Sequence, residues 1–478
     1  MHDVLIIGAG FGGLALAHAL KQDGNDDFAI LERGDGVGGT WRHNTYPGAA
    51  CDVPSHLYSL SFAPNPDWSR AYAGQPEILR YVEDYYDRLD VRRHVRIGTH
   101  VVAATWDDDE HVWTLTDSEG GHHVARTVVF AIGTFHTPAP PAIAGLEDFA
   151  GPVLHSAQWD ADVELDGRSV AVIGTGASAI QLVPAIADRV ANLDLYQRTA
   201  AWVMPRKDDP YTDEQRRTFA EQPDVAQAHR RELYDRLEQA EIYLLGDATA
   251  AAVEQMALAY LAYAVPDPDL RAALTPDYAF GCKRVLISSD YYPALQRDDV
   301  ELVTTAIDRV TPCGIRTVDG TERPADVLVL CTGFRANDYL RGIRITGRGG
   351  ADLHERWAGT PRAFHGLAVP GFPNLFQMYG PNTNQGGNSI LLILEAQATF
   401  IAGAVQALTR GDADVLDVQP VAMDRYTREL EAALATTVWN SCDSYFRNAA
   451  GAIVTQLPHT SSWYRDQTST FPIADFRT

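Results

Sequence analysis

Residues 149–179 read FAGPVLHSAQWDADVELDGRSVAVIGTGASA, and this stretch decides the fold. Its second half begins with an apolar strand, 169–173, that runs directly into a glycine turn. In dinucleotide-binding domains such a turn lets the backbone approach a pyrophosphate, which sits at the N-terminus of the following helix. Ala179 takes the last glycine position, where alanine is tolerated. We therefore expect a nucleotide site formed by Gly174, Thr175, Gly176 and Ser178.

A turn of the same kind lies near the N-terminus, behind the apolar strand 4–7, and carries Gly8, Gly10 and Gly13. One glycine-rich turn is a weak signal, but two of them, each behind a buried strand of Val and Ile, are a strong one. The sequence thus predicts an α/β protein with two Rossmann-like dinucleotide-binding domains.

The residues that end the second strand of each unit differ in charge. Glu32 follows the strand 28–31, where a carboxylate binds ribose hydroxyls and repels a 2′-phosphate. Arg198 ends the corresponding strand 193–198, where a cation accommodates the 2′-phosphate of NADP. We expect FAD in the first site and NADPH in the second.

The order of elements predicts how the chain divides. Residues 1–140 form the first part of the FAD-binding domain, 141–325 the NADP-binding domain, and 326–478 the second part of the FAD-binding domain with a C-terminal segment. A charged, then small and apolar stretch at about 210–275 is nearly free of glycine turns and predicts a helical insertion in the NADP domain. An apolar run around Leu391 to Leu408 carries Glu395 and reads as a buried helix.

Three further segments carry candidate site residues. The first, 38–52, is rich in Gly, Pro and aromatic residues and is expected to be a functional loop; it contains Gly39, Thr40, Trp41 and Asp52. The second, 280–292, places Lys283 and Arg284 together before an apolar strand. The third, 376–388, ends at Asn388, a natural N-cap for a helix whose N-terminus could face the electron-rich end of a flavin ring.

Charge and cysteine content exclude several classes. A net charge of -24 argues against nucleic-acid and membrane partners, because phosphate binding needs a face of Lys and Arg. The five cysteines are scattered without a Cys-x-x-Cys pair, which suggests neither a redox dithiol nor a metal site. We expect five unpaired thiols and, with a strand already beginning at Val4, a cytoplasmic protein.

The whole chain resembles the class B flavin monooxygenases, and specifically the type I Baeyer–Villiger monooxygenases. That family's linker fingerprint, Phe-x-Gly-x-x-x-His-x-x-x-Trp-(Pro or Asp), is matched by Phe149, Gly151, His155, Trp159 and Asp160. Its longer fingerprint is matched by Gly38, Gly39, Trp41, Tyr46, Pro47, Gly48 and Asp52. Plain flavin-containing monooxygenases usually end the linker motif in Tyr-(Arg or Lys), so Trp159 and Asp160 discriminate between the two.

The resemblance implies a reaction. NADPH reduces FAD, the reduced flavin and O2 give a C4a-peroxyflavin, and one oxygen is inserted next to the carbonyl of a small-molecule ketone to form an ester or lactone. It implies Arg284 as the catalytic arginine and Asp52 as the acidic partner that holds it. Lys283 and Arg198 match residues that contact the 2′-phosphate, and His155 matches a hinge residue rather than a base. A peroxide anion also requires a fixed positive partner in a dry site, and an arginine supplies one.

Three alternatives stay open at this point. An N- or S-oxygenating flavin monooxygenase would use the same cofactors and is distinguished by its product. A pyridine-nucleotide disulfide reductase is disfavoured by the missing Cys-x-x-Cys. A flavin-binding module without turnover would not need Arg284, Asp52 and Arg198 together. Neither the ketone nor the oligomeric state can be read from the sequence.

Replacing Arg198 by alanine tests the assignment of the two sites. We expect the Arg198→Ala variant to lose affinity for NADPH much more than for NADH, because only NADPH carries the 2′-phosphate. Steady-state kinetics with each cofactor measure this difference, and equal losses for both would contradict the assignment.

Overall fold

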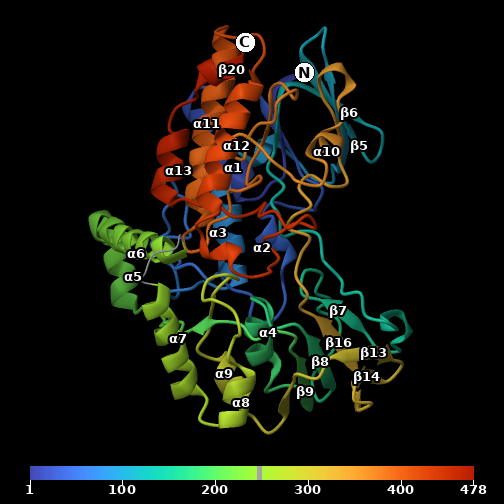
Figure 1. Ribbon diagram of the computed structural model, residues 1–478. Helices are drawn as coiled ribbons and strands as arrows, with labels where there is room; N and C mark the ends of the chain where they lie inside the picture. The colour runs from blue at the N-terminus through green and yellow to red at the C-terminus, as the bar shows by residue number, and fades with distance from the viewer. Residues whose placement is uncertain (245–249) are drawn as a thin grey trace.

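The computed structural model describes residues 1–244 and 250–478. Figure 1 shows two lobes, one above the other, with both termini at the top of the upper lobe. The lobes hold the two predicted nucleotide-binding units, so the expected α/β fold with two Rossmann-like domains is confirmed.

The upper lobe is built on an eight-stranded sheet in which buried parallel strands lie at the centre. The order is β17-β4-β5-β6-β1-β2-β3, with β18 paired to β6. The strands are β1 (His2–Ile7), β2 (Phe28–Leu31), β3 (Val95–Arg96), β4 (Val101–Asp107), β5 (Val112–Asp117), β6 (His122–Phe130), β17 (Arg344–Thr346) and β18 (Leu375–Gln377). Strand β1 is parallel to both β2 and β6, so the first glycine turn leaves the sheet between two parallel neighbours.

The lower lobe contains a five-stranded parallel sheet in the order β12-β9-β8-β16-β7. Its strands are β7 (Val153–His155), β8 (Ser169–Ile173), β9 (Asn192–Tyr196), β12 (Val300–Val303) and β16 (Val327–Leu330). A small antiparallel sheet of β13 (Ile307–Thr311), β14 (Gly314–Thr317) and β15 (Glu322–Pro324) adjoins it, and β10 (Val203–Met204) pairs with β11 (Leu286–Ile287).

The boundary expected at residue 326 is wrong by one strand. Strand β16 pairs with β8 and with β7, so it belongs to the second domain. Its run of four buried apolar residues reads the same in either sheet, and pairing alone decides where it lies. The chain therefore returns to the first domain after Leu330.

The predicted helical insertion is present but covers more than the second domain. It consists of α5 (Asp213–Glu221), α6 (Pro223–Leu244), α7 (Ala250–Ala264) and α8 (Pro268–Ala273). Leu261 of α7 packs into the core of the second domain. Arg230 of α6 instead donates hydrogen bonds to the carbonyl oxygens of His56, Leu57 and Ser59 in the first domain. The insertion thus spans both lobes (Figure 1).

The remaining helices complete the cores. They are α1 (Phe11–Gln22), α2 (Thr40–His43), α3 (Gln75–Arg88), α4 (Ala179–Ile186), α9 (Tyr291–Ala294), α10 (Leu353–Trp357), α11 (Ile390–Arg410), α12 (Pro420–Leu434) and α13 (Ser461–Thr468). A last short pair of strands, β19 (Asp417–Val418) and β20 (Phe476–Arg477), lies near the C-terminus. Among the described residues, α11 is the one helix long and apolar enough to cross a membrane, and 67% of its most apolar window is buried. It packs against α1 and α13, so the prediction of a buried core helix is confirmed.

The expectation of five unpaired thiols is wrong. Cys282 and Cys442 form a disulfide, with their Cα atoms 6.1 Å apart, while Cys51, Cys313 and Cys331 are free. A separation of 160 residues gives no signal in the sequence, because only the fold brings these two thiols together. The cysteines therefore no longer argue for a reducing compartment, and a cytoplasmic location stays a prediction.

Gly13 offers a test of the packing that shapes the first turn. A Cβ atom at this position would lie 2.3 Å from the carbonyl oxygen of Gly8, so any side chain pushes α1 away from β1. We expect Gly13→Ala to lower stability by about 1–3 kcal/mol, the usual cost of overpacking, and to reduce FAD content. Thermal unfolding and flavin absorbance measure both. Gly12→Ala is the matched control, since its Cβ would come no closer than 3.4 Å to a neighbour. Equal stability of the two variants would contradict this account.

Candidate functional site

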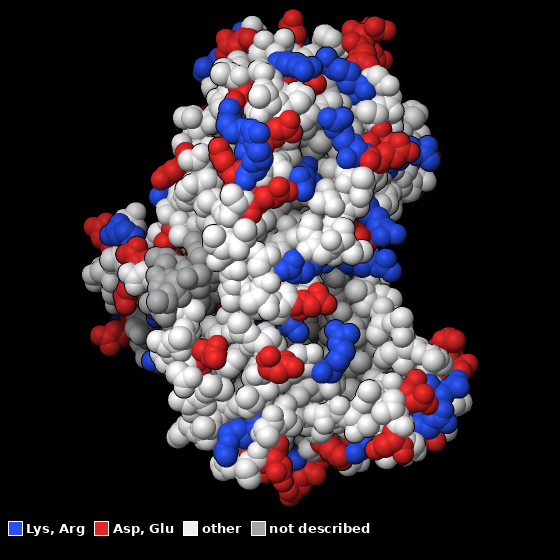
Figure 2. Space-filling model, viewed as in Figure 1, with Lys and Arg blue, Asp and Glu red and all other residues white. Residues whose placement is uncertain are grey.

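A single cavity of about 1470 Å³ is lined by both glycine turns. Figure 2 shows the surface hollowed between the two lobes, with Lys and Arg side chains along the hollow. Every predicted site residue except Gly13 lines the cavity: Gly8, Gly10, Glu32, Gly39, Thr40, Trp41, Asp52, Gly174, Thr175, Gly176, Ser178, Arg198, Lys283, Arg284 and Asn388. Gly13 acts instead through the contact of α1 with β1.

The middle glycine of each turn shows that the cavity fits a pyrophosphate. Gly10 has φ −89°, and Gly176 also lies outside the left-handed region, so neither needs to be glycine for its backbone conformation. A Cβ on Gly10 would meet its nearest neighbour at 3.6 Å, and one on Gly176 would meet nothing within 4 Å. The missing side chains leave open space in front of two helix N-termini, where a diphosphate binds.

Glu32 is buried at the end of β2 and lines the cavity beside the first turn. Its two carboxylate oxygens accept hydrogen bonds from the backbone N–H groups of Ala9 (2.8 Å) and Gly34 (2.7 Å). The carboxylate is therefore fixed in place, where it can accept bonds from ribose hydroxyls.

The segment 38–52 contains a short helix, which was not expected. Gly39 has φ +54°, and the chain then makes one helical turn, α2, that carries Thr40 and Trp41. The indole N–H of Trp41 donates to the Tyr58 hydroxyl at 3.0 Å. This bond fixes Trp41 against Tyr58, and both side chains line the cavity.

The second nucleotide site has two cations and an ordered turn. The hydroxyl of Thr175 donates to the carbonyl oxygen of Thr199 at 3.1 Å, and Ser178 stands before the first residue of α4. Arg198 is exposed just after β9, and the Lys283 ammonium lies 4.5 Å from the centre of the Tyr278 ring. Both cations line the cavity, where a phosphate could reach them.

Arg284 and Asp52 form an ion pair between the two domains. One oxygen of Asp52 accepts from Nε of Arg284 at 3.0 Å and from Nη2 at 2.5 Å. The carboxylate raises the pKa of the guanidinium further above its ordinary value, so the positive charge is permanent. Tyr379 and Tyr445 also line this part of the cavity, and burial raises the pKa of Tyr445 while the Arg284 charge opposes the rise.

Asn388 is not the N-cap of α11. Ser389 occupies that position, and Asn388 accepts from the backbone N–H of Ser389 at 2.8 Å. Its amide nitrogen donates to Glu238 of α6 at 3.2 Å, and Glu238 also accepts from the backbone N–H of Ser462 at 3.0 Å. The insertion therefore holds a cavity residue in place, a link that sequence reasoning missed because 150 residues separate the partners.

His155 ends β7 and is buried at the point where the chain enters the second sheet. Its Nδ1 accepts from the backbone N–H of Ala157 at 3.0 Å, and its Nε2 lies 3.4 Å from the Thr332 hydroxyl. Burial lowers the pKa of this imidazole, so it is neutral at pH 7 and can accept this bond. Neither contact is with a reacting group, which agrees with a structural role.

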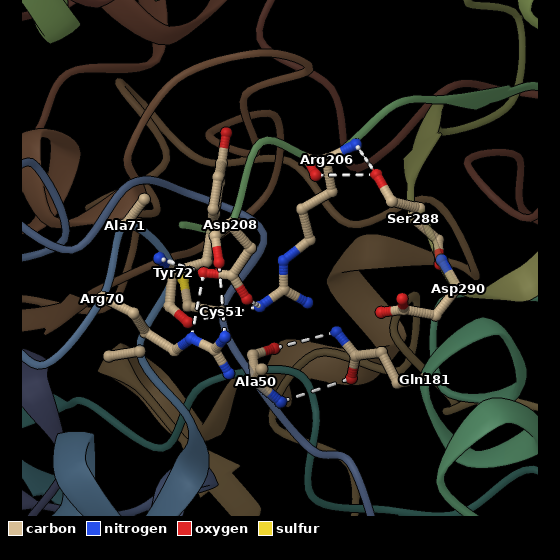
Figure 3. A network of polar contacts seen from close by, with 12 residues as sticks. Ala50, Cys51, Arg70, Ala71, Tyr72, Gln181, Arg206, Asp208, Ser288 and Asp290 are labelled. Carbon is tan, nitrogen blue, oxygen red and sulfur yellow. Dashed lines mark hydrogen bonds and ion pairs between the residues drawn. The ribbon is translucent and has the colours of Figure 1, made fainter. Parts of the chain in front are cut away.

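A second group of polar contacts, also missed from the sequence, crosses the domain boundary beside Cys51 (Figure 3). Asp208 of the second domain accepts from the backbone N–H of Tyr72 at 3.0 Å and pairs with Arg206 at 2.7 Å. Arg206 in turn donates to the carbonyl oxygen of Tyr72 at 3.2 Å, and Arg70 lies 3.3 Å from Asp208. These ties join residues 70–72, which lie beside the segment of Cys51, to residues 206–208, which follow the strand β10 that pairs with β11.

In the part of the chain that the structure describes, no three His, Cys, Asp or Glu side chains lie together in a way that could hold a metal ion.

Comparisons with known proteins bear on the site as a whole. Residues 5–255 match the family described as pyridine nucleotide-disulphide oxidoreductase. A protein of Pseudomonas aeruginosa named Baeyer-Villiger monooxygenase is 43% identical over 447 residues, which cover 93% of this chain and 85% of that protein. The structure described as oxidized steroid monooxygenase bound to NADP has a TM-score of 0.87 at 33% identity, covering 98% of this chain and 97% of that one. OTEMO in complex with FAD and NADP has a TM-score of 0.88 at 27% identity, covering 98% and 97%.

The linker offers a test of the role of His155. We expect His155→Ala to slow product formation while FAD stays bound, because Ala157 loses its acceptor at the domain boundary. In the wild type, the neutral imidazole that accepts this bond exists only above the lowered pKa of His155. As the pH falls through that pKa the imidazole is protonated and the bond is lost, so acid should slow the wild-type reaction as the substitution does. Rates per bound flavin from pH 5 to 8 measure this, with His123→Ala, a partly buried histidine paired to Asp117 outside the cavity, as the control. Loss of FAD with an unchanged rate per flavin would contradict it.

Proposed function

The chain belongs to the pyridine nucleotide-disulphide oxidoreductase family and, by its nearly full-length relatives, to the Baeyer–Villiger monooxygenases, and from this premise we propose that it inserts one oxygen atom of O2 next to the carbonyl of a small-molecule ketone. The product is an ester or lactone, and the protein is an FAD-dependent, NADPH-consuming flavoprotein monooxygenase. The observation that carries the proposal is the Arg284–Asp52 ion pair in a cavity lined by two nucleotide turns.

The name of the matching family does not make this chain a disulfide reductase. Such enzymes pass electrons to a closely spaced cysteine pair, and this sequence has no Cys-x-x-Cys. The bridge it does form joins cysteines 160 residues apart, one in each domain. What the chain shares with that family is the two-turn nucleotide-binding architecture.

The residues that would hold FAD include a carboxylate, whereas those that would hold NADPH include two cations. Gly8, Gly10, Glu32 and Trp41 would hold FAD, with Glu32 at the ribose. Gly174, Gly176, Arg198 and Lys283 would hold NADPH, with the two cations at its 2′-phosphate. When bound, the two cofactors supply the electrons and the activated oxygen of the reaction.

Arg284 stabilises the negative charge that builds up on oxygen. Its guanidinium is permanently charged and presents several N–H donors in a fixed plane. In a site from which water is excluded, such donors stabilise an oxyanion far more than they do in water. They would act first on the attacking oxygen and then on the carbonyl oxygen of the ketone, which becomes negative as the new bond forms.

Asp52 positions this arginine. It takes up Nε and one Nη2 donor, which fixes the plane of the guanidinium and leaves its other edge for the reacting oxygen. Because the pair crosses between the domains, the positive charge reaches the first-domain part of the cavity although Arg284 belongs to the second.

Replacing Arg284 by alanine tests the proposal. Removing one charge-stabilising donor costs about 10²–10³ in rate at comparable oxyanion sites, so ester formation should fall by at least that factor. NADPH should still reduce the flavin, and its electrons should then appear as hydrogen peroxide. Asp52→Ala should show a milder loss, because the charge remains but is less well placed. Mass analysis measures the ester. NADPH consumption and hydrogen peroxide are measured in parallel for the wild type and both variants.

The control is Arg297→Ala, which removes a similar Arg–Asp pair, to Asp299 at 2.9 Å, from the surface outside the cavity. Normal ester yield from Arg284→Ala would overturn the assignment. A sulfide tested beside the ketones decides whether heteroatom oxygenation, which we propose only as a second activity, occurs at the same site.

A further inference from the structure

Gln181 joins the second nucleotide turn to the segment that carries Asp52. It lies in the first turn of α4, five residues after Gly176, and it lines the cavity. Figure 3 shows its side-chain amide directed at Ala50, two residues before Asp52, from the opposite domain.

The amide of Gln181 is bonded on both of its sides. Its nitrogen donates to the carbonyl oxygen of Ala50 at 3.0 Å, and its oxygen accepts from the backbone N–H of Ala50 at 3.4 Å. The same oxygen accepts from the Tyr46 hydroxyl at 2.8 Å. A side-chain amide that both donates to and accepts from one residue's backbone fixes the position of that residue along the chain and its orientation.

The backbone around these bonds packs directly against α4. Gly48 has φ +79°, and a Cβ atom there would lie 2.5 Å from the carbonyl oxygen of Gln181. On its other edge, Ala50 forms a bridge with Gly74, and Cys51 donates to the carbonyl oxygen of Ala73 at 3.1 Å. Residues 46–51 are therefore held between the first domain and Gln181 of the second.

We propose that Gln181 is a positioning residue for the oxygen-insertion step, which sets the place of Asp52 and through it the guanidinium of Arg284. The inference rests on the proposed function, since it concerns the same ion pair. Asp52 follows Ala50 by two residues, so a shift of the segment against α4 moves the carboxylate directly. Displacements of about 1 Å can cost about 100-fold in a rate that depends on placement.

The test is Gln181→Met, which keeps the length of the side chain and removes all three hydrogen bonds. We expect the product formed per NADPH oxidised to fall about fivefold, the effect of losing the net energy of a typical hydrogen bond. The missing electrons should appear as hydrogen peroxide, since NADPH, a proton and O2 then give NADP⁺ and H2O2. Tyr46→Phe, which removes one of the three bonds, should change the ratio in the same direction by less.

A matched control is Gln296→Met. Gln296 also donates to backbone carbonyl oxygens, those of Ala264 (2.8 Å) and Tyr292 (2.9 Å), but within the second domain and outside the cavity. Its ratio of product to NADPH should equal that of the wild type. FAD content and unfolding temperature establish that all variants are folded.

A double-mutant cycle separates positioning from general support of the fold. If Gln181 acts through Asp52, then Gln181→Met should have no further effect on the ratio in an Asp52→Asn background. Equal losses in both backgrounds would overturn the inference. So would a raised KM for NADPH with an unchanged ratio, which would make Gln181 a cofactor ligand instead. Failure of the wild type itself to oxygenate any ketone would contradict the proposed function, whereas normal coupling in Gln181→Met and Tyr46→Phe would contradict this inference alone.

Discussion

The ion pair between Asp52 and Arg284 is the constraint on which the rest of the site depends. It joins a loop of the first domain to a segment of the second, 232 residues further along the chain. Both side chains are about one-third exposed, so each charge has lost much of its water and needs the other. Separating the domains would break this pair. The pair therefore favours the arrangement in which both nucleotide turns line one cavity.

The two nucleotide-binding units have the same backbone arrangement but carry side chains of opposite charge. Each has a middle glycine that opens space before a helix N-terminus, and each has a charged residue shortly after its second strand. The first carries Glu32, which is buried and held by two backbone N–H groups, whereas the second carries Arg198, which is exposed. The fixed carboxylate of Glu32 can accept hydrogen bonds from neutral ribose hydroxyls. The exposed cation of Arg198 can attract the phosphate of a cofactor that binds from solution. In a protein with a net charge of -24, such local cations are what a phosphate-bearing cofactor can bind.

The sequence predicts the parts of this protein that are encoded within a few residues. Glycine turns, buried strands and the insertion all leave such local patterns, and all are present where they were expected. What the sequence could not show is pairing between distant segments. Strand β16 has the same apolar residues whichever sheet it joins, Cys282 and Cys442 lie 160 residues apart, and Asn388 meets Glu238 across 150 residues. The contact of Gln181 with Ala50 could not be predicted for the same reason. The sequence does not show which residue a polar side chain on a helix will contact.

The segment that carries Arg284 is tied to the first domain at two points only two residues apart. Cys282 is bonded to Cys442, which lies between Trp439 and Phe446 of the first-domain core, and Arg284 is paired with Asp52. Strand β11 follows at once and pairs with β10 of the second domain. Any rotation of the second domain must therefore preserve the position of residues 282–284 or break one of these ties. The contact of Gln181 with Ala50 is of a different kind, since it consists of hydrogen bonds that water can replace. The domain interface thus has a covalent tie beside the arginine, whereas its contact at α4 consists of hydrogen bonds.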